Sequence, residues 1–71
     1  MTALGQGIRV NGVAQPLDVV FVAQLLRAMG LADRPGIAVA VNGAVVPRAG
    51  WSEHALAPGD EVEVVGAAQG G

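Results

Sequence analysis

Residues 8–30 read IRVNGVAQPLDVVFVAQLLRAMG, and the spacing of their apolar side chains changes once along this stretch. Up to Leu17, apolar and polar residues alternate, which predicts two short strands on either side of Asn11-Gly12. Asn-Gly favours a type I′ turn, because both central residues of that turn need a positive φ. Pro16 has no N–H to donate to a neighbouring strand, so we expect the second strand at an edge of the sheet.

The spacing becomes helical after Asp18. One stripe of an amphipathic helix is formed by Val22, Leu25, Leu26 and Met29. Gly30 is expected to end this helix, with Leu31 making the apolar contact that often follows a glycine C-cap. Asp18 is a candidate N-cap, because its short side-chain oxygen can accept from unpaired amides. The stiff residues 19–21 favour a later start.

The next segments repeat the hairpin pattern. Asp33–Gly36 is a turn cluster, and Ile37–Val41 alternates valines with small alanines, which predicts a strand crowded on both faces. Asn42-Gly43 then predicts a second type I′ hairpin, which returns through residues 44–46.

The last third of the chain contains a loop and one more strand. Residues 48–59 show no clear period and are expected to form a crossover loop, closed by a turn at Pro58–Asp60. Val62 and Val64 then alternate with two glutamates, which predicts a strand with one wet face. This strand runs directly into the terminal glycines.

The order strand, strand, helix, strand, strand, loop, strand predicts an α+β protein with a mixed sheet of about five strands and one helix packed across it. We expect the first and last strands to lie side by side and parallel at the centre of the sheet. This is the β-grasp, or ubiquitin-like, topology. The expected organisation is a flexible leader over residues 1–7, the β-grasp domain over 8–65 and a flexible tail over 66–71.

Composition excludes several classes of function. The 71 residues include four arginines, no lysine and no cysteine, and the net charge is −2. This charge gives no basic face for nucleic acid, and apolar runs of five residues are far too short to span a membrane. His54 is the sole histidine, so no metal site is expected. Without a signal peptide or disulfides, we expect a cytoplasmic protein.

The most distinctive chemistry lies in the last residues, Gly66 to Gly71. Glycine has no Cβ, so a terminal Gly-Gly can enter a narrow slot in a partner enzyme and leave its α-carboxylate open to attack. A frayed, glycine-rich terminus is the plainer interpretation of the same residues.

The chain from Ile8 to Gly71 resembles the ThiS family, the sulfur-carrier proteins of thiamine biosynthesis. The matching segments are residues 22–26 with Gly30, residues 37–42, Val46-Pro47-Arg48 followed by Trp51, and Gln69-Gly70-Gly71. The stretch from Val46 to Trp51 is the most discriminating of these, since Gly-Gly is shared by all ubiquitin-like carriers. Two departures are the first seven residues and the apolar residues 19–21, where the family has polar ones.

The resemblance implies a mechanism in which this chain is a protein co-substrate and not an enzyme. A partner similar to ubiquitin-activating enzymes would use ATP and Mg²⁺ to adenylate the Gly71 carboxylate, and the chain itself would bind no cofactor. A persulfide on another protein would then convert the adenylate into a thiocarboxylate. Thiazole synthase would receive this tail and take up the sulfur.

The candidate site residues follow from the tail and its surroundings. Gly71 carries the reacting atoms. The expected partner-binding residues are Gly70, Gln69, Ala68, Ala67, Val65, Val46, Pro47 and Arg48. Trp51 is predicted to cover the small core, because its large area is most valuable when buried. Glu61 and Glu63 are interpreted as a solvated stripe and not as an acid/base pair.

Three alternatives stay open on the sequence. The chain could be the small subunit of molybdopterin synthase, which shares the fold and the tail. It could be a protein modifier that forms isopeptide bonds, or an interaction domain in which the two terminal glycines are incidental.

Overall fold

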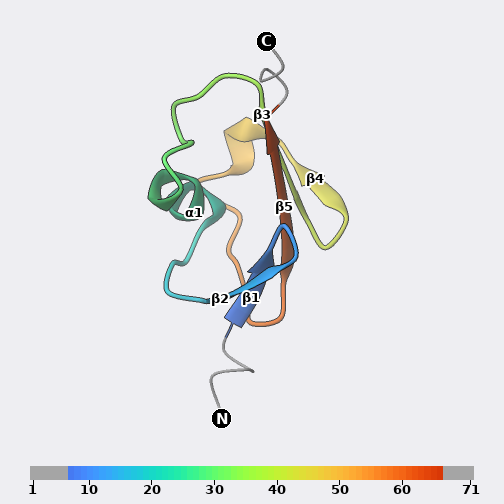
Figure 1. Ribbon diagram of the computed structural model, residues 1–71. Helices are drawn as coiled ribbons and strands as arrows, with labels where there is room; N and C mark the ends of the chain where they lie inside the picture. The colour runs from blue at the N-terminus through green and yellow to red at the C-terminus, as the bar shows by residue number, and fades with distance from the viewer. Residues whose placement is uncertain (1–6, 67–71) are drawn as a thin grey trace.

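The computed structural model describes residues 7–66 (Figure 1). Its elements, in chain order, are β1 (Gly7–Val10), β2 (Val13–Pro16), α1 (Val22–Ala28), β3 (Ile37–Val41), β4 (Ala44–Val46), a 3₁₀ turn η2 (Arg48–Gly50) and β5 (Glu61–Gly66). The domain therefore extends one residue beyond each expected boundary, because Gly7 and Gly66 both belong to strands. The rest of the predicted leader and tail lies outside the described residues.

The five strands form one mixed sheet in the order β2-β1-β5-β3-β4. The β1 and β5 strands are parallel neighbours, whereas β1 pairs with β2, and β3 with β4 and β5, in antiparallel fashion. The predicted β-grasp topology, with the first and last strands together at the centre, is confirmed. The β2 strand ends at Pro16 and lies at an edge of the sheet. This is the position expected for a strand that contains proline, because proline has no N–H to donate to a neighbouring strand.

Both predicted Asn-Gly turns are present. The φ angles are 52° at Asn11 and 83° at Gly12 in the first hairpin, and 53° at Asn42 and 85° at Gly43 in the second. Asparagine is one of the few side chains that tolerates this left-handed conformation, because its short amide can form local hydrogen bonds. The Asn-Gly pair at each turn thus determines the conformation of that turn.

The helix begins later than Asp18, and the prediction of Asp18 as its N-cap is wrong. Phe21 occupies the N-cap position in an extended conformation. The side-chain oxygen of Gln24, in the first turn, accepts hydrogen bonds from Val20 N at 2.8 Å and Phe21 N at 2.9 Å. A glutamine at this position commonly reaches back to the start of the helix. The stiff apolar residues 19–21 all precede the helix, which agrees with the later start that they favour.

The crossover loop supplies partners for the first helical amides. Val22 N donates to the carbonyl of His54 at 3.0 Å, and Ala23 N donates to that of Trp51 at 2.9 Å. These amides have no partner within the helix itself. The loop therefore completes the N-terminal end of α1.

Gly30 closes the helix as predicted: α1 has its C-cap at Met29, and Gly30 follows with a φ of 77°. Gly30 N donates to Arg27 O at 3.0 Å and Leu31 N donates to Leu26 O at 2.8 Å. These two bonds define a Schellman motif. Met29 is 37% exposed, so the buried stripe is one residue shorter than expected.

The core lies between α1 and one face of the sheet. Its buried side chains are Ile8, Val10, Val22, Leu25, Leu26, Val39, Val41, Val46, Trp51, Leu56, Val62 and Val64. The opposite face has no helix over it in the part of the chain that the structure describes, and Ala38 is exposed there. The prediction that β3 is crowded on both faces is therefore wrong, because the single helix covers only one of them.

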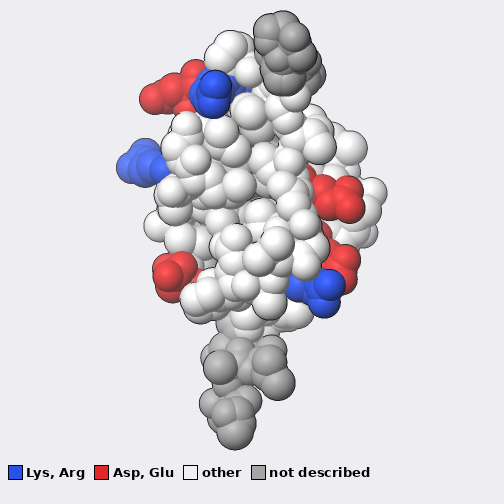
Figure 2. All heavy atoms as spheres, in the orientation of Figure 1, with Lys and Arg blue, Asp and Glu red and all other residues white. Residues whose placement is uncertain are grey.

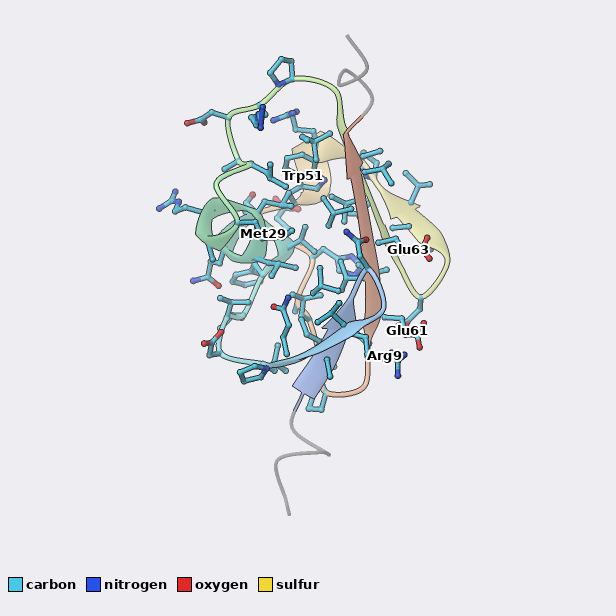
Figure 3. All side chains as sticks on the ribbon, viewed as in Figure 1. Arg9, Met29, Trp51, Glu61 and Glu63 are labelled. Atoms are coloured by element: carbon cyan, nitrogen blue, oxygen red, sulfur yellow. The ribbon has the colours of Figure 1, made fainter. Side chains whose placement is uncertain are left out.

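Figure 3 shows Arg9, Glu61 and Glu63 on the side of the sheet that faces away from α1. The side chains of Val62 and Val64, which alternate with the glutamates, are buried, so the predicted wet face of the last strand is confirmed. Within residues 7–66, no helix has the length and apolar character required to cross a membrane.

Candidate functional site

The central strand β5 leads the chain toward its terminal glycines. It ends at Gly66, opposite Ile37 at the start of β3. The predicted tail residues 67–71, which include Gly70 and Gly71, lie outside the described residues. Within residues 7–66, the candidate site consists of the end of β5 and the residues that surround it (Figure 1).

The two sides of β5 are supported differently. On one side, β3 stays paired with β5 to its last residue, through Ala38↔Val65 and Ile37↔Gly66. On the other side, the β1 pairing ends at Val10↔Val62. Beyond that point the side chain of Asn11 contacts Val64, donating from Nδ2 to its carbonyl at 3.1 Å and accepting from its amide at 2.8 Å.

Arg48 connects two loops near the same end of the sheet. Its guanidinium donates to Ala32 O at 3.2 Å and to Arg34 O at 2.7 Å. The same group lies 4.4 Å from the centre of the Trp51 ring, a cation–π distance. Arg48 thus ties the segment after α1 to η2, through one hydrogen bond from each of its two terminal nitrogens.

Trp51 is 5% exposed, and its indole N–H donates to Val46 O at 2.9 Å. Burial with a satisfied N–H is the arrangement expected of a tryptophan that belongs to the core. The interpretation of Trp51 as a cover of the core is confirmed.

An exposed apolar surface lies beside the end of β5. It consists of Ala38, Val45, Pro47 and Val65, which we call the tail-end patch. Val65 is 59% exposed and Val45 is 75% exposed. Of the candidate partner-binding residues, Val46 is 6% exposed and belongs to the core, so the surface valine of β4 is its neighbour Val45.

One charged side chain adjoins this patch: Glu63 is exposed and precedes Val65 by two residues, on the same face of β5. Figure 2 shows that the charged side chains on the displayed face are few and lie at its margins. Arg9 and Glu61 approach to 3.8 Å, but both side chains are more than half exposed, and such a pair is worth only about 0–1 kcal/mol. Within residues 7–66, no three histidine, aspartate or glutamate side chains gather to hold a metal ion.

Sequence reasoning missed two contacts, those of Asn11 with Val64 and of Arg48 with the loop after α1. Asn11 was predicted only as a turn residue, because its partner is 53 positions away. The three-residue spacing of Arg48 and Trp51, one turn of a 3₁₀ helix, signals only the contact between those two side chains and not the contact with the loop.

The β-grasp fold, together with a Gly-Gly segment just beyond the central strand, defines a small ubiquitin-like protein. The model of the ThiS family matches residues 8–71, and the chain belongs to this family. The structure is similar to the crystal structure of the thiamine biosynthesis protein ThiS from Geobacter metallireducens. The TM-score is 0.75 with 29% sequence identity, over 92% of this chain and 99% of that one. No curated protein matches the sequence. The resemblance found in the sequence is thus confirmed, and the family is one of sulfur carriers in thiamine biosynthesis.

Proposed function

We propose that this chain carries sulfur on the carboxyl group of Gly71 for assembly of the thiazole ring of thiamine. The observation that supports this most directly is the position of the Gly-Gly segment. Gly66 ends the central strand, so five residues separate the sheet from the terminal carboxylate. Fully extended, five residues reach at most about 17 Å, enough to enter a deep slot in a partner while the domain stays outside.

The proposed chemistry begins with activation by a partner of the ubiquitin-activating type. The Gly71 carboxylate attacks the α-phosphate of Mg²⁺-bound ATP, and pyrophosphate leaves. The resulting acyl adenylate supplies the leaving group that a carboxylate lacks. The terminal sulfur of a persulfide then displaces AMP and forms an acyl disulfide. A thiol attacks the donor's sulfur in that bond, which releases the Gly71 thiocarboxylate and leaves a disulfide on the donor side.

The second partner in this proposal is thiazole synthase. It accepts the thiocarboxylate, incorporates the sulfur and returns the Gly71 carboxylate. The catalytic side chains belong to the partners, as does the bound ATP and Mg²⁺. All of these proteins would act in the cytoplasm.

The experiment that tests this proposal is intact-mass spectrometry after incubation with ATP, Mg²⁺, a cognate activating enzyme and a persulfide source. Replacement of one oxygen by sulfur, followed by loss of that sulfur to thiazole synthase, is the expected result. An adenylate that never acquires sulfur would point to a protein modifier. A lasting complex with one larger subunit would favour the molybdopterin synthase alternative.

A glycine substitution in the tail sharpens this test. Gly70→Ala should slow activation strongly at an unchanged melting temperature, because a methyl group obstructs the slot. Gly50→Ala is the matched control, since a Cβ there would meet nothing nearer than 3.9 Å. Equal activation rates for Gly70→Ala and the unmodified chain would count against a narrow slot.

We also propose the tail-end patch as the surface that docks on the partners, with Gly70, Gln69, Ala68 and Ala67 entering the slot. Exposed apolar residues beside a functional segment commonly mark such a surface. Arg48 would act there indirectly, through the loop that it holds.

Val65→Glu is expected to weaken complex formation by about tenfold or more, because binding would bury a charge. Val13→Glu is a closely matched control, because Val13 is 61% exposed against 59% for Val65 and lies on the edge strand β2. Binding would be measured by titration calorimetry with the activating enzyme. Equal losses in the two variants would exclude the tail-end patch as the docking surface.

A further inference from the structure

The β1 strand is too short to accompany β5 to its end. Its register with β5 covers Arg9↔Glu61 and Val10↔Val62, after which the chain turns away at Asn11-Gly12. The last contribution of the β1 backbone is the amide of Asn11, which donates to Val62 O at 2.8 Å. From Val64 onward, the sheet offers backbone pairing from β3 only.

The Asn11 side chain takes the place of the missing strand residue. Its amide oxygen accepts from Val64 N at 2.8 Å and its amide nitrogen donates to Val64 O at 3.1 Å. A side-chain amide has the same donor and acceptor as a peptide group, so it can pair with both the N–H and the C=O of one strand residue. Asparagine also accepts the φ of 52° that the turn requires. One residue therefore makes the turn and extends the pairing of β5.

We propose that Asn11 is a positioning residue for the terminal segment. By holding both backbone groups of Val64, it fixes the direction in which the chain leaves the sheet toward Gly71. The two residues that follow Val64 within β5 are paired on the β3 side only, through Ala38 and Ile37. Within residues 7–66, Asn11 thus makes the last contact with the β5 backbone on the β1 side.

Asn42 provides an internal control with the same turn conformation. Its side chain also contacts β5, accepting from Glu61 N at 2.9 Å and donating to Asp60 Oδ1 at 2.9 Å. These contacts lie at the start of β5, away from the end that leads to the tail. Asn42 therefore stabilises β5 in a comparable way without directing its exit.

The test compares Asn11→Gly with Asn42→Gly in the full chain. Glycine adopts the required positive φ readily, so both variants keep their turns and lose only the side-chain contacts. Amide hydrogen exchange measured by NMR should accelerate from Val64 through Gly66 in the first variant and at Glu61 in the second. An acceleration of roughly three- to tenfold corresponds to the loss of one hydrogen bond.

The functional arm rests on the proposed sulfur-carrier role. With the activating enzyme, Asn11→Gly should raise KM by about three- to tenfold at nearly unchanged kcat, because a less directed tail loses more freedom on binding. Asn42→Gly should leave KM unchanged at a similar loss of thermal stability. A general loss of stability would shift both variants alike, so the difference between them separates positioning from folding.

Unchanged exchange at Val64 in Asn11→Gly would overturn the proposal, and so would equal KM changes in the two variants. If the unmodified chain is not activated at all, the proposed function fails. In that event the NMR measurement still decides the positioning role. Faster exchange that extends from Val64 to Gly66 in Asn11→Gly alone would support it, and confinement to Val64 would overturn it.

Discussion

The two Asn-Gly hairpins have almost identical turns and serve opposite ends of the same strand. Asn11 and Asn42 have φ values of 52° and 53°, and each directs its side chain at β5. Because β1 runs parallel to β5 and β3 runs antiparallel to it, the first turn points toward the exit of β5 and the second toward its start. The Asn-Gly pair determines the conformation of each turn. The direction of the preceding strand relative to β5 determines which residues the asparagine side chain contacts.

The partners of the two asparagines differ as well. Asn11 uses its amide on the backbone of Val64 alone. Asn42 divides its amide between the Glu61 backbone and the carboxylate of Asp60, which also accepts from Ala57 N at 2.9 Å. The second hairpin therefore fixes the turn that precedes β5, and the first fixes the strand itself.

The largest effect that tests this comparison concerns the residue before each turn. Val10 and Val41 end β1 and β3 and are 3% and 5% exposed. Val10→Ala and Val41→Ala should each lower the free energy of unfolding by about 2 kcal/mol, because each removes buried methyl groups and leaves a small cavity. Urea denaturation would measure both. Val13→Ala, at an exposed site, is the control with little expected change. A large difference between the two buried variants would show that the hairpins do not share one core.

A smaller effect is expected at the glycines of the turns. Gly12→Ala and Gly43→Ala should each cost about 1 kcal/mol, because a Cβ is unfavourable at positive φ. Nothing lies within 4 Å of a Cβ built at either position, so the cost comes from the backbone alone and should be the same in both. Unequal melting temperatures of the two variants would mean that the turns are not equivalent.

The smallest effect is expected from Arg9→Ala. The Arg9–Glu61 pair spans β1 and β5 at 3.8 Å, but both side chains are largely in solvent. The free energy of unfolding should change by less than about 0.5 kcal/mol. If urea denaturation showed a loss of free energy of unfolding above about 1 kcal/mol, the ion pair on the outer face of the sheet would contribute substantially to the pairing of β1 with β5.

Most of the fold could be predicted because its signals are local. Each Asn-Gly turn, the Gly30 helix end and the alternation of Val62 and Val64 depend on residues close together in sequence. The order of these elements then restricts the topology to few choices. The ThiS family resemblance rested on the same segments.

The errors and omissions concern contacts made at a distance. Asp18 was a reasonable cap by residue type, but Phe21 occupies the N-cap position and the first helical amides donate to carbonyls of the crossover loop. Likewise, the alanines of β3 are crowded only if a helix covers their face of the sheet. The alternation of residues in the β3 sequence does not reveal how many faces the helices cover. The Asn11 and Arg48 contacts join residues 53 and 14 to 16 positions apart, so no short-range pattern contains them.

Arg48 and Asn11 share one further property: their acceptors in these contacts are all main-chain carbonyls, at Ala32, Arg34 and Val64. A carbonyl is present whatever side chain its residue bears. Arg34 is exposed, so a substitution at position 34 changes the surface of this loop and leaves in place the carbonyl that Arg48 contacts. The side chains of the loop can therefore vary while the main-chain contacts that fix its position stay the same.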